Sequence, residues 1–371
     1  MPEQTFSDPS TPRDGTLPNI RELNRQQISG VMTSLGQQAY RARQLHQWLY
    51  SHQARSFDEM SSFSKRLRQQ LADAWAIRPA ELDTVETEPA RRSMPGHIPT
   101  SKFLLRMDDG ELIESVLIPS EERMTACLSS QAGCALRCTF CATGQMGFRR
   151  DLTASEITDQ AFLLDREAWR LYGRGITNIV FMGMGEPLLN LDNLFEAIAT
   201  LTEKEYNFNI SERKITISTV GLVPEIGRIA RSGLRSKLAI SLHSASQTIR
   251  ERMMPVAADY PLDALSTAIS AYNGETGQPV TLVWMLLEGI NDTPEEARKL
   301  TRFAKRGLCK INLIDYNAIV NLKFRPGYSD TKTMFIQRLL EAGLLVTVRK
   351  SQGATINAAC GQLATRSGND D

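Results

Sequence analysis

The spacing of hydrophobic residues changes along the chain and predicts two regions of different structure. In residues 20–78 the apolar positions recur every three to four residues, as on one face of a helix. In "YRARQLHQWLYS" this spacing places Ala42, Leu45, Trp48 and Leu49 on one face of a helix. The same spacing recurs in "SSFSKRLRQQLADAW". We therefore expect a small helical accessory domain at residues 19–95. The acidic, proline-containing stretch 79–99 reads as a linker.

After residue 100, short apolar runs alternate with helical segments. "KFLLRMDDGELIESVLIP" predicts a β-hairpin, because Asp109-Gly110 is a strong turn signal between two apolar runs. Thr153 and Glu156 form a capping box that begins a long helix. Six further strands are expected: Met124–Ser129, Asn178–Met182, Ile215–Thr219, Leu238–Leu242, Thr281–Leu287 and Ile311–Tyr316.

Strands that alternate with helices predict a parallel sheet in an α/β fold. Six such units predict a partial, TIM-like (β/α)6 barrel within a domain at residues 100–365. In such a barrel, functional residues lie at the carboxyl ends of the strands. Small and polar residues gather there, at Ser129-Ser130, Gly183–Pro187, Ser218–Gly221, Ser241–His243 and Tyr316-Asn317. We therefore expect a ligand site at this end of the sheet.

The composition is that of an ordinary globular protein, with 42% hydrophobic and 23% charged residues and a net charge of +1 over 371 residues. This balance excludes a chain that is basic throughout. A local excess remains, because residues 20–78 hold nine Lys/Arg and four Asp/Glu, a net charge of +5. It fits a nucleic-acid-binding face as well as an ordinary solvated helix surface.

Nothing at the N-terminus resembles a signal peptide, and no apolar run is long enough to span a bilayer. Residues 1–18 and the tail 366–371 read as disordered. A cytoplasmic location without a membrane is therefore expected, and thiols stay reduced in that compartment. The six cysteines are then better explained by metal or redox chemistry than by disulfides.

Three of these cysteines form a CxxxCxxC array in "CALRCTFCATG", at Cys134, Cys138 and Cys141. A structural zinc site takes four protein ligands, and no fourth cysteine or nearby histidine follows. Three thiolates on a 4Fe–4S cluster would instead leave one iron open to a substrate or cofactor. An incomplete zinc site or unrelated thiols are the alternatives.

The array resembles the cluster loop of radical S-adenosylmethionine (radical SAM) enzymes. In that superfamily the open iron chelates the amino and carboxylate groups of SAM, and one electron cleaves SAM to a 5′-deoxyadenosyl radical. The strand end "GMGEP" is similar to one that contacts the amino group of SAM. Gly183 and Gly185 permit a close backbone approach, and Glu186 can accept a hydrogen bond from an ammonium group.

Several separated motifs resemble one family within this superfamily, the radical SAM adenine-C2 methyltransferases of 23S ribosomal RNA and transfer RNA (the RlmN type). They are "CLSSQAGCALRCTFCATGQMGF", "GMGEPLLN", "ISTVGLVP", "LAISLH" and "INAACGQL". The resemblance extends from about residue 20 to 365. It implies one 4Fe–4S cluster and two SAM molecules consumed per methylation.

The resemblance also implies roles for single residues. Cys134, Cys138 and Cys141 match the cluster ligands. The matches to the SAM contacts are Gly185, Glu186, Ser218, Ser241, Leu242, His243 and Asn317.

Three further matches concern the chemistry. Cys360 matches the cysteine that carries the methyl group, and Cys127 its partner in a transient disulfide. Glu114 matches a glutamate assigned as a proton acceptor; by itself it would read as an exposed strand carboxylate. The family's mechanism explains the pair of cysteines, because carbon 2 of adenine is not a nucleophile. A methylene radical formed on Cys360 adds to that carbon, and Cys127 then attacks the Cys360 sulfur and releases the product.

The expected partners are 23S rRNA, tRNA, an electron donor of the flavodoxin or ferredoxin type and a disulfide reductant, with the chain as a monomer. Candidate RNA contacts are the basic helical domain and the C-terminal set Lys323, Arg325, Arg349 and Lys350. Two alternatives remain open: the related enzyme that methylates carbon 8 of the same adenosine, and a zinc-stabilised RNA-binding protein without catalysis.

Overall fold

The computed structural model describes residues 17–89, 98–204, 208, 210–319, 322–349 and 352–365. The tail expected at 366–371 and nearly all of the arm expected at 1–18 lie outside this part. No helix within it combines the length and apolar character that a membrane crossing requires.

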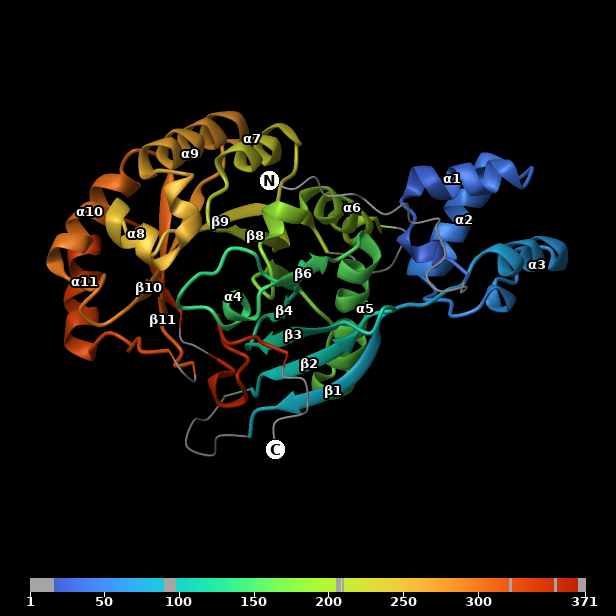
Figure 1. Cartoon of the computed structure of the whole chain (residues 1–371), viewed down its shortest axis with the longest axis horizontal. Helices are drawn as coiled ribbons and strands as arrows, with labels where there is room; N and C mark the ends of the chain where they lie inside the picture. Colours follow the sequence, from blue (N-terminus) through green and yellow to red (C-terminus); the bar gives the residue numbers. More distant parts are fainter. Residues whose placement is uncertain are drawn as a thin grey trace.

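The helical region expected before residue 80 is present and has a hydrophobic core of its own. It consists of α1 (Arg25–Ser34), α2 (Ala39–Tyr50) and α3 (Lys65–Ala74), which lie to one side of the molecule (Figure 1). Asn24 begins α1 with a capping box, and the Ser64 side chain accepts from the third amide of α3. The side chains at the core include Leu45, Leu49, Met60, Phe63, Leu67 and Leu71.

A ten-stranded sheet forms the centre of the rest of the described chain, in the order β1-β2-β3-β4-β7-β8-β9-β10-β11-β12. Neighbouring strands are antiparallel from β1 to β4 and parallel from β4 to β12. The strands are β1 (Glu81–Thr87), β2 (Ser101–Arg106), β3 (Leu112–Pro119), β4 (Met124–Cys127), β7 (Asn178–Phe181), β8 (Ile215–Thr219), β9 (Lys237–Ser241), β10 (Val280–Leu286), β11 (Cys309–Asp315) and β12 (Val346–Arg349).

The sheet agrees with the prediction of a partial barrel. Strands β2 and β3 are the expected hairpin around Asp109-Gly110, and the six expected parallel strands are β4 and β7–β11. Strands β1 and β12 are its two edges, so the barrel is open. Strand β12 adds a further parallel strand that the sequence does not predict. The pattern misses it because "VTVR" is short and half-exposed.

The prediction of a linker at 79–99 is wrong for its first part, because residues 81–87 form β1. This strand pairs with β2, with Glu81 opposite Arg106 at one end and Thr87 opposite Ser101 at the other. Its side chains are largely exposed, because it is an edge strand, so the periodic burial that marks a strand in the sequence is weak. Residues 90–97 of the expected linker lie outside the described residues.

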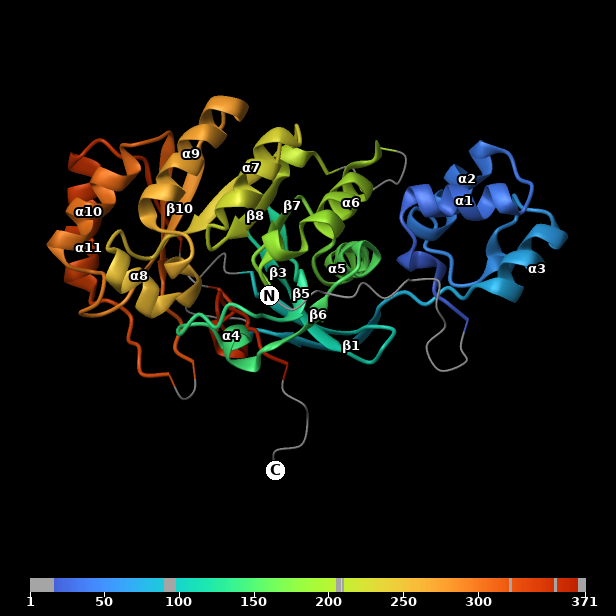
Figure 2. The same cartoon turned by 45° about the horizontal axis from the view of Figure 1, so that its top comes forward.

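Helices cover the outer face of the sheet in an arc (Figures 1 and 2). They are α5 (Ala154–Tyr172), α6 (Leu191–Thr202), α7 (Val223–Arg231), α8 (Gln247–Met253), α9 (Leu262–Thr276), α10 (Pro294–Ala304) and α11 (Ser329–Glu341). The capping box of Thr153 and Glu156 begins α5 as predicted, and Gly173 ends it in the left-handed conformation. The main core lies between sheet and helices and includes Phe103, Phe181 and Trp284.

A buried ion pair joins the helical region to the sheet region. The Arg21 guanidinium contacts the Asp159 carboxylate of α5 and donates to the Leu49 carbonyl at 2.6 Å. Asp159 also accepts from the Ala80 amide at 3.0 Å. Arg21 therefore contributes a buried contact to the orientation of the helical region. It is 3% exposed, so this part of the expected basic surface is unavailable to RNA.

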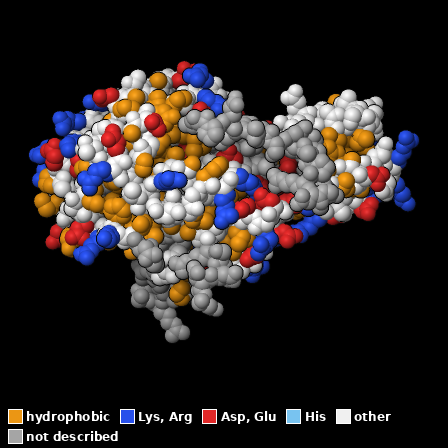
Figure 3. All heavy atoms as spheres, viewed as in Figure 1, with side chains coloured by type: hydrophobic (Ala, Val, Ile, Leu, Met, Phe, Trp, Pro, Cys, Tyr) orange, Lys and Arg blue, Asp and Glu red, His pale blue; other side chains and the backbone are white. Residues whose placement is uncertain are grey.

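Other basic residues of the region do face solvent. Lys and Arg side chains lie at the end of the helical region farthest from the sheet (Figure 3). The exposed ones include Arg43, Arg55, Lys65 and Arg66. In the C-terminal set, Lys323 and Arg325 are exposed, and Lys350 lies outside the described residues.

Candidate active site

The three cysteines of the CxxxCxxC array lie on a loop that its own backbone holds tightly. The loop connects β5 (Gln131–Gly133) to α4 (Ala142–Met146), and β5 pairs with β6 (Phe148–Asp151). The Cys134 amide donates to the Gly147 carbonyl at 2.9 Å. A Cβ on Gly133 would lie 1.9 Å from that carbonyl oxygen, so only glycine fits before Cys134.

All three thiols line one cavity of about 160 Å³. Burial raises the pKa of Cys134 to about 12 and that of Cys138 well above its usual value, and each is raised further by the neighbouring cysteines. Burial likewise raises the pKa of Cys141. Ionising all three side by side therefore requires a compensating positive centre. Three convergent thiols in an apolar wall are the donor set that iron–sulfur clusters use.

In the described part of the chain, no three His, Cys, Asp or Glu side chains are grouped as a site for a single metal ion. The cavity also contains His243, whose Nδ1 accepts from the Met285 amide at 3.1 Å. Burial lowers the pKa of His243 to about 3. The imidazole is therefore neutral with its proton on Nε2, which makes it a hydrogen-bond donor and not a fourth metal ligand.

The strand end "GMGEP" after β7 depends on its glycines. A Cβ on Gly183 would lie 2.7 Å from the Leu128 carbonyl oxygen, and one on Gly185 would lie 2.5 Å from Gln131 Cβ. Gly185 also has a φ of +95°. The two glycines bring this turn against the residues after β4 and place the next residue, Glu186, in the cavity wall.

Glu186 is a buried carboxylate whose oxygens face backbone amides. Oε1 accepts from the Leu188 amide at 3.1 Å and Oε2 from the Val220 amide at 3.0 Å. Burial raises the pKa of Glu186 to about 7, although these amides and the Thr219 hydroxyl oppose the effect. The side chain thus ties the ends of β7 and β8 together, and an ammonium group from a ligand would stabilise its charged form.

The other expected cofactor contacts divide into two groups. Gly185, Ser218, Ser241 and His243 line the cavity together with Glu186. Leu242 presents its side chain to the main core and is fully buried there. Asn317 is outside the cavity lining, and its side-chain amide donates to the Cys360 carbonyl at 3.4 Å.

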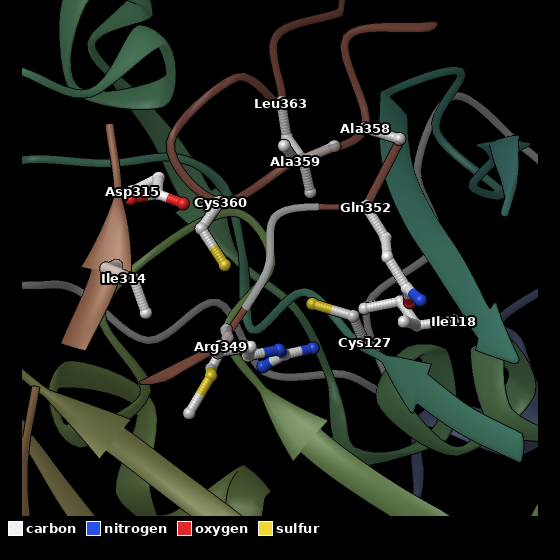
Figure 4. Close-up of a pocket in the computed structure, with 11 residues that line it drawn as sticks. Ile118, Cys127, Ile314, Asp315, Arg349, Gln352, Ala358, Ala359, Cys360 and Leu363 are labelled. Atoms are coloured by element: carbon white, nitrogen blue, oxygen red, sulfur yellow. The ribbon is translucent and has the colours of Figure 1, made fainter. Parts of the chain in front are cut away.

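Cys360 lies where the main cavity meets a smaller one of about 30 Å³, and it lines both. The smaller cavity also contains Cys127, from the end of β4. The two sulfur atoms point toward one another across it (Figure 4). Both thiols are free in this structure. Burial raises the pKa of Cys127 to about 12, the Cys360 thiol raises it further, and Arg349 acts to lower it.

Arg349 is a residue at this junction for which the sequence indicates no role beyond RNA contact. It ends β12 and lines both cavities, with its guanidinium beside Cys127 in Figure 4. Because the sequence does not predict β12 as a strand, it does not place Arg349 at a strand end.

The C-terminal segment that carries Cys360 is bound to the cysteine loop and to β3. The Ala142 amide donates to the Gly361 carbonyl at 2.7 Å, and the Thr143 hydroxyl to the Leu363 carbonyl at 2.6 Å. Glu114 of β3 accepts from the Ala364 amide at 2.9 Å. Figures 1 and 2 show this segment beside α4. These contacts bring Cys360 to the cysteine loop, over two hundred residues away in the sequence.

Glu114 is itself buried, and its carboxylate lies 3.2 Å from the Lys102 ammonium. Burial raises the pKa of Glu114, and Lys102 opposes that rise. The carboxylate is not part of the lining of either cavity. Its contacts in this structure position the C-terminal segment.

Comparisons with known proteins assign the chain to a family. Residues 128–302 match the model of the radical SAM superfamily, and residues 18–77 match that of the ribosomal RNA large subunit methyltransferase N-terminal domain. A protein of Chlorobaculum tepidum named "Probable dual-specificity RNA methyltransferase RlmN" is 71% identical over 94% of this chain and 93% of its own length. A protein of the same name from Chlorobium phaeobacteroides is 55% identical over 94% and 96%.

The fold has a close counterpart among solved structures. A radical SAM methyltransferase from Sphaerobacter thermophilus superimposes with a TM-score of 0.83 at 38% identity, covering 93% of this chain and 98% of that one. Similarity over nearly the full length of these relatives includes both the helical region and the sheet with its cysteine loop. The chain therefore belongs to the RlmN family of radical SAM RNA methyltransferases.

Proposed function

We propose that the protein is a dual-specificity enzyme that methylates carbon 2 of an adenine in 23S rRNA and in tRNA, through a methyl group carried on Cys360. The observation that carries this proposal is the position of Cys360, which lines both the cavity of the three cysteines and the cavity of Cys127. A single side chain can therefore face the source of the radical on one side and the disulfide partner on the other.

Cys134, Cys138 and Cys141 would hold the 4Fe–4S cluster, with Glu186, Ser218, Ser241 and His243 around the bound SAM. When bound, the cluster and SAM supply a 5′-deoxyadenosyl radical. The Cys360 thiolate first takes a methyl group from one SAM as the nucleophile. Its S-methyl group then loses a hydrogen atom to the radical and adds to carbon 2 of the adenine, which links RNA to protein.

Release of the RNA requires the second cysteine. The ring then gives up its proton and one electron, which the oxidised cluster would accept. The Cys127 thiolate attacks the Cys360 sulfur, the bond from that sulfur to the methylene carbon breaks, and the carbon takes up a proton to become the methyl group. Arg349 beside Cys127 favours the thiolate form that this attack needs. We assign the ring proton to Glu114, which matches the proton acceptor of the family and whose carboxylate contacts Lys102 and the Ala364 amide in this structure.

The target adenosine must leave its stack to enter the site, at a cost of about a few kcal/mol. Contacts between Lys or Arg side chains and RNA phosphates can offset that cost. We further propose that the enzyme acts as a monomer in the cytoplasm. A flavodoxin- or ferredoxin-type donor supplies electrons, and a thiol reductant opens the disulfide.

Mass spectrometry of RNA treated with the anaerobically reconstituted enzyme tests the proposal. We expect 2-methyladenosine in both rRNA and tRNA substrates, none with Cys360→Ala, and a covalent RNA–protein adduct with Cys127→Ala. Cys309→Ala is the matched control, because Cys309 begins β11 at the opposite end of the sheet, and it should retain activity. Formation of 8-methyladenosine would identify the carbon-8 enzyme, and a protein that takes up zinc and methylates nothing would identify the non-catalytic alternative.

A further inference from the structure

Arg250 is a buried cation whose described hydrogen bonds go to backbone carbonyls and not to a carboxylate. It lies on α8 and is 1% exposed. Its guanidinium donates to the carbonyls of Val220 and Tyr260, and its Nε has no hydrogen-bond partner. Among the described residues, no Asp or Glu carboxylate lies within ion-pair distance of Arg250, and Cys138 is close enough that its thiolate form would raise the pKa of Arg250.

The charge of Arg250 persists at neutral pH. Burial lowers its pKa to about 10, which still leaves the guanidinium protonated near pH 7. A buried charge without a counter-charge is strongly destabilising. A negative partner that is absent from the polypeptide would recover this free energy.

The position of Arg250 indicates where that partner binds. Helix α8 is the element on which the cysteine loop rests: the Thr139 amide and hydroxyl both donate to the Met253 carbonyl, at 2.9 and 3.2 Å. Cys138 and Met253 pack in one hydrophobic cluster. Val220, whose carbonyl accepts from Arg250, lines the cavity of the three cysteines. Arg250 thus lies behind the wall of that cavity, one helical turn from the loop's attachment point.

We propose that Arg250 is the charge partner of the iron–sulfur cluster and raises its reduction potential. Three thiolates give the bound cluster a net negative charge, and reduction adds one more. A fixed cation in a medium of low dielectric constant stabilises the more negative, reduced form. Arg250 therefore acts on the reaction indirectly: its charge stabilises the reduced cluster, and the side chain does not contact the RNA. The inference rests on the proposed function only in requiring that the cluster binds.

A redox titration of the reconstituted cluster, followed by electron paramagnetic resonance, tests the assignment. R250M and R250Q should both shift the midpoint potential to more negative values, while R250K should stay near the wild type. R252M is the matched control, since Arg252 lies on the same helix but is exposed, and it should leave the potential unchanged. A purely structural role predicts equal potentials in all loaded variants, and that result would overturn the proposal.

The second readout compares thermal stability with and without the cluster. Without the cluster, R250M removes an uncompensated buried charge. The rise in Tm on cluster loading should therefore be smaller in R250M and R250Q than in the wild type and R250K. An equal rise in all four proteins would contradict the proposal. A wild-type protein that loads no iron would contradict the proposed function as well, and iron content distinguishes that outcome from a loaded cluster with an unchanged potential.

Discussion

At the residue scale, the chemistry depends on groups whose neutral forms the fold favours. Burial raises the pKa of the array cysteines and of Cys127, and it raises that of Glu186 to about 7. Each ionises more readily when a positive centre is close, which in the proposed function is the cluster for the three array thiols, Arg349 for Cys127 and a ligand ammonium for Glu186. The site is thus arranged to become charged as its ligands bind.

Glu186 gives a measurable pH dependence in the ligand-free protein. Its proton is held more tightly in the folded protein than in the unfolded chain, so stability should fall as the pH rises from 4.5 to about 7. At about 1.4 kcal/mol for each pKa unit, the loss is on the order of 3 kcal/mol. Denaturant titrations at pH 5 and pH 8 measure it. Glu186→Gln should flatten the difference between the two pH values, and an unchanged difference would contradict the account.

At the scale of elements, burial decides how much of the fold the sequence predicts. Strands β4 and β7–β11 each contain buried apolar residues, and the sequence predicts each strand within a few residues. The exposed edge strands β1 and β12 carry little periodic signal, so the pattern predicts a linker at the first and no strand at the second. The site shows the same division. Motifs indicate the cysteines and Glu186, but Arg349 and Arg250 are single residues placed only by tertiary packing.

The turn after β7 should tolerate no side chain at Gly185. A Cβ there would lie 2.5 Å from Gln131 and would occupy a positive φ. We expect Gly185→Ala to cost about 1–3 kcal/mol of unfolding free energy and to displace Glu186. Gly274→Ala is the control, because Gly274 lies within α9 with open space around it. It should stabilise the protein by about 0.5–1 kcal/mol. Equal effects of the two changes in chemical denaturation would refute this explanation.

At the scale of the whole molecule, the buried Arg21–Asp159 ion pair helps to orient the helical region on the sheet, together with the more exposed pairs Arg25–Glu203 and Arg78–Asp108. Arg21→Met would leave the Asp159 carboxylate buried without its partner, and we expect a loss of about 3–5 kcal/mol. Arg298→Met removes an exposed ion pair with Glu295 on α10 and should change stability little. Chemical denaturation with limited proteolysis near residue 78 measures both. Similar losses in the two variants would show that the Arg21 ion pair does not hold the region in place.

We propose that the exposed basic residues of the helical region bind the RNA backbone. Replacing Arg43, Arg55, Lys65 and Arg66 by Gln should weaken tRNA binding and flatten the dependence of log affinity on log salt, by about 0.7–0.9 for each phosphate that is no longer neutralised. Arg298→Gln with Arg302→Gln on α10 is the control and should keep the wild-type slope. If the fourfold variant also keeps that slope, the helical region does not bind the RNA backbone.

The central claim is that the methyl group passes through Cys360 as a radical, and isotope labelling tests it most directly. With SAM whose methyl group carries three deuterium atoms, one deuterium should appear in 5′-deoxyadenosine. The new methyl group on adenine should then keep two, since the third position is filled from solvent. A methyl group that arrives with all three deuterium atoms, and 5′-deoxyadenosine that carries none, would contradict the account.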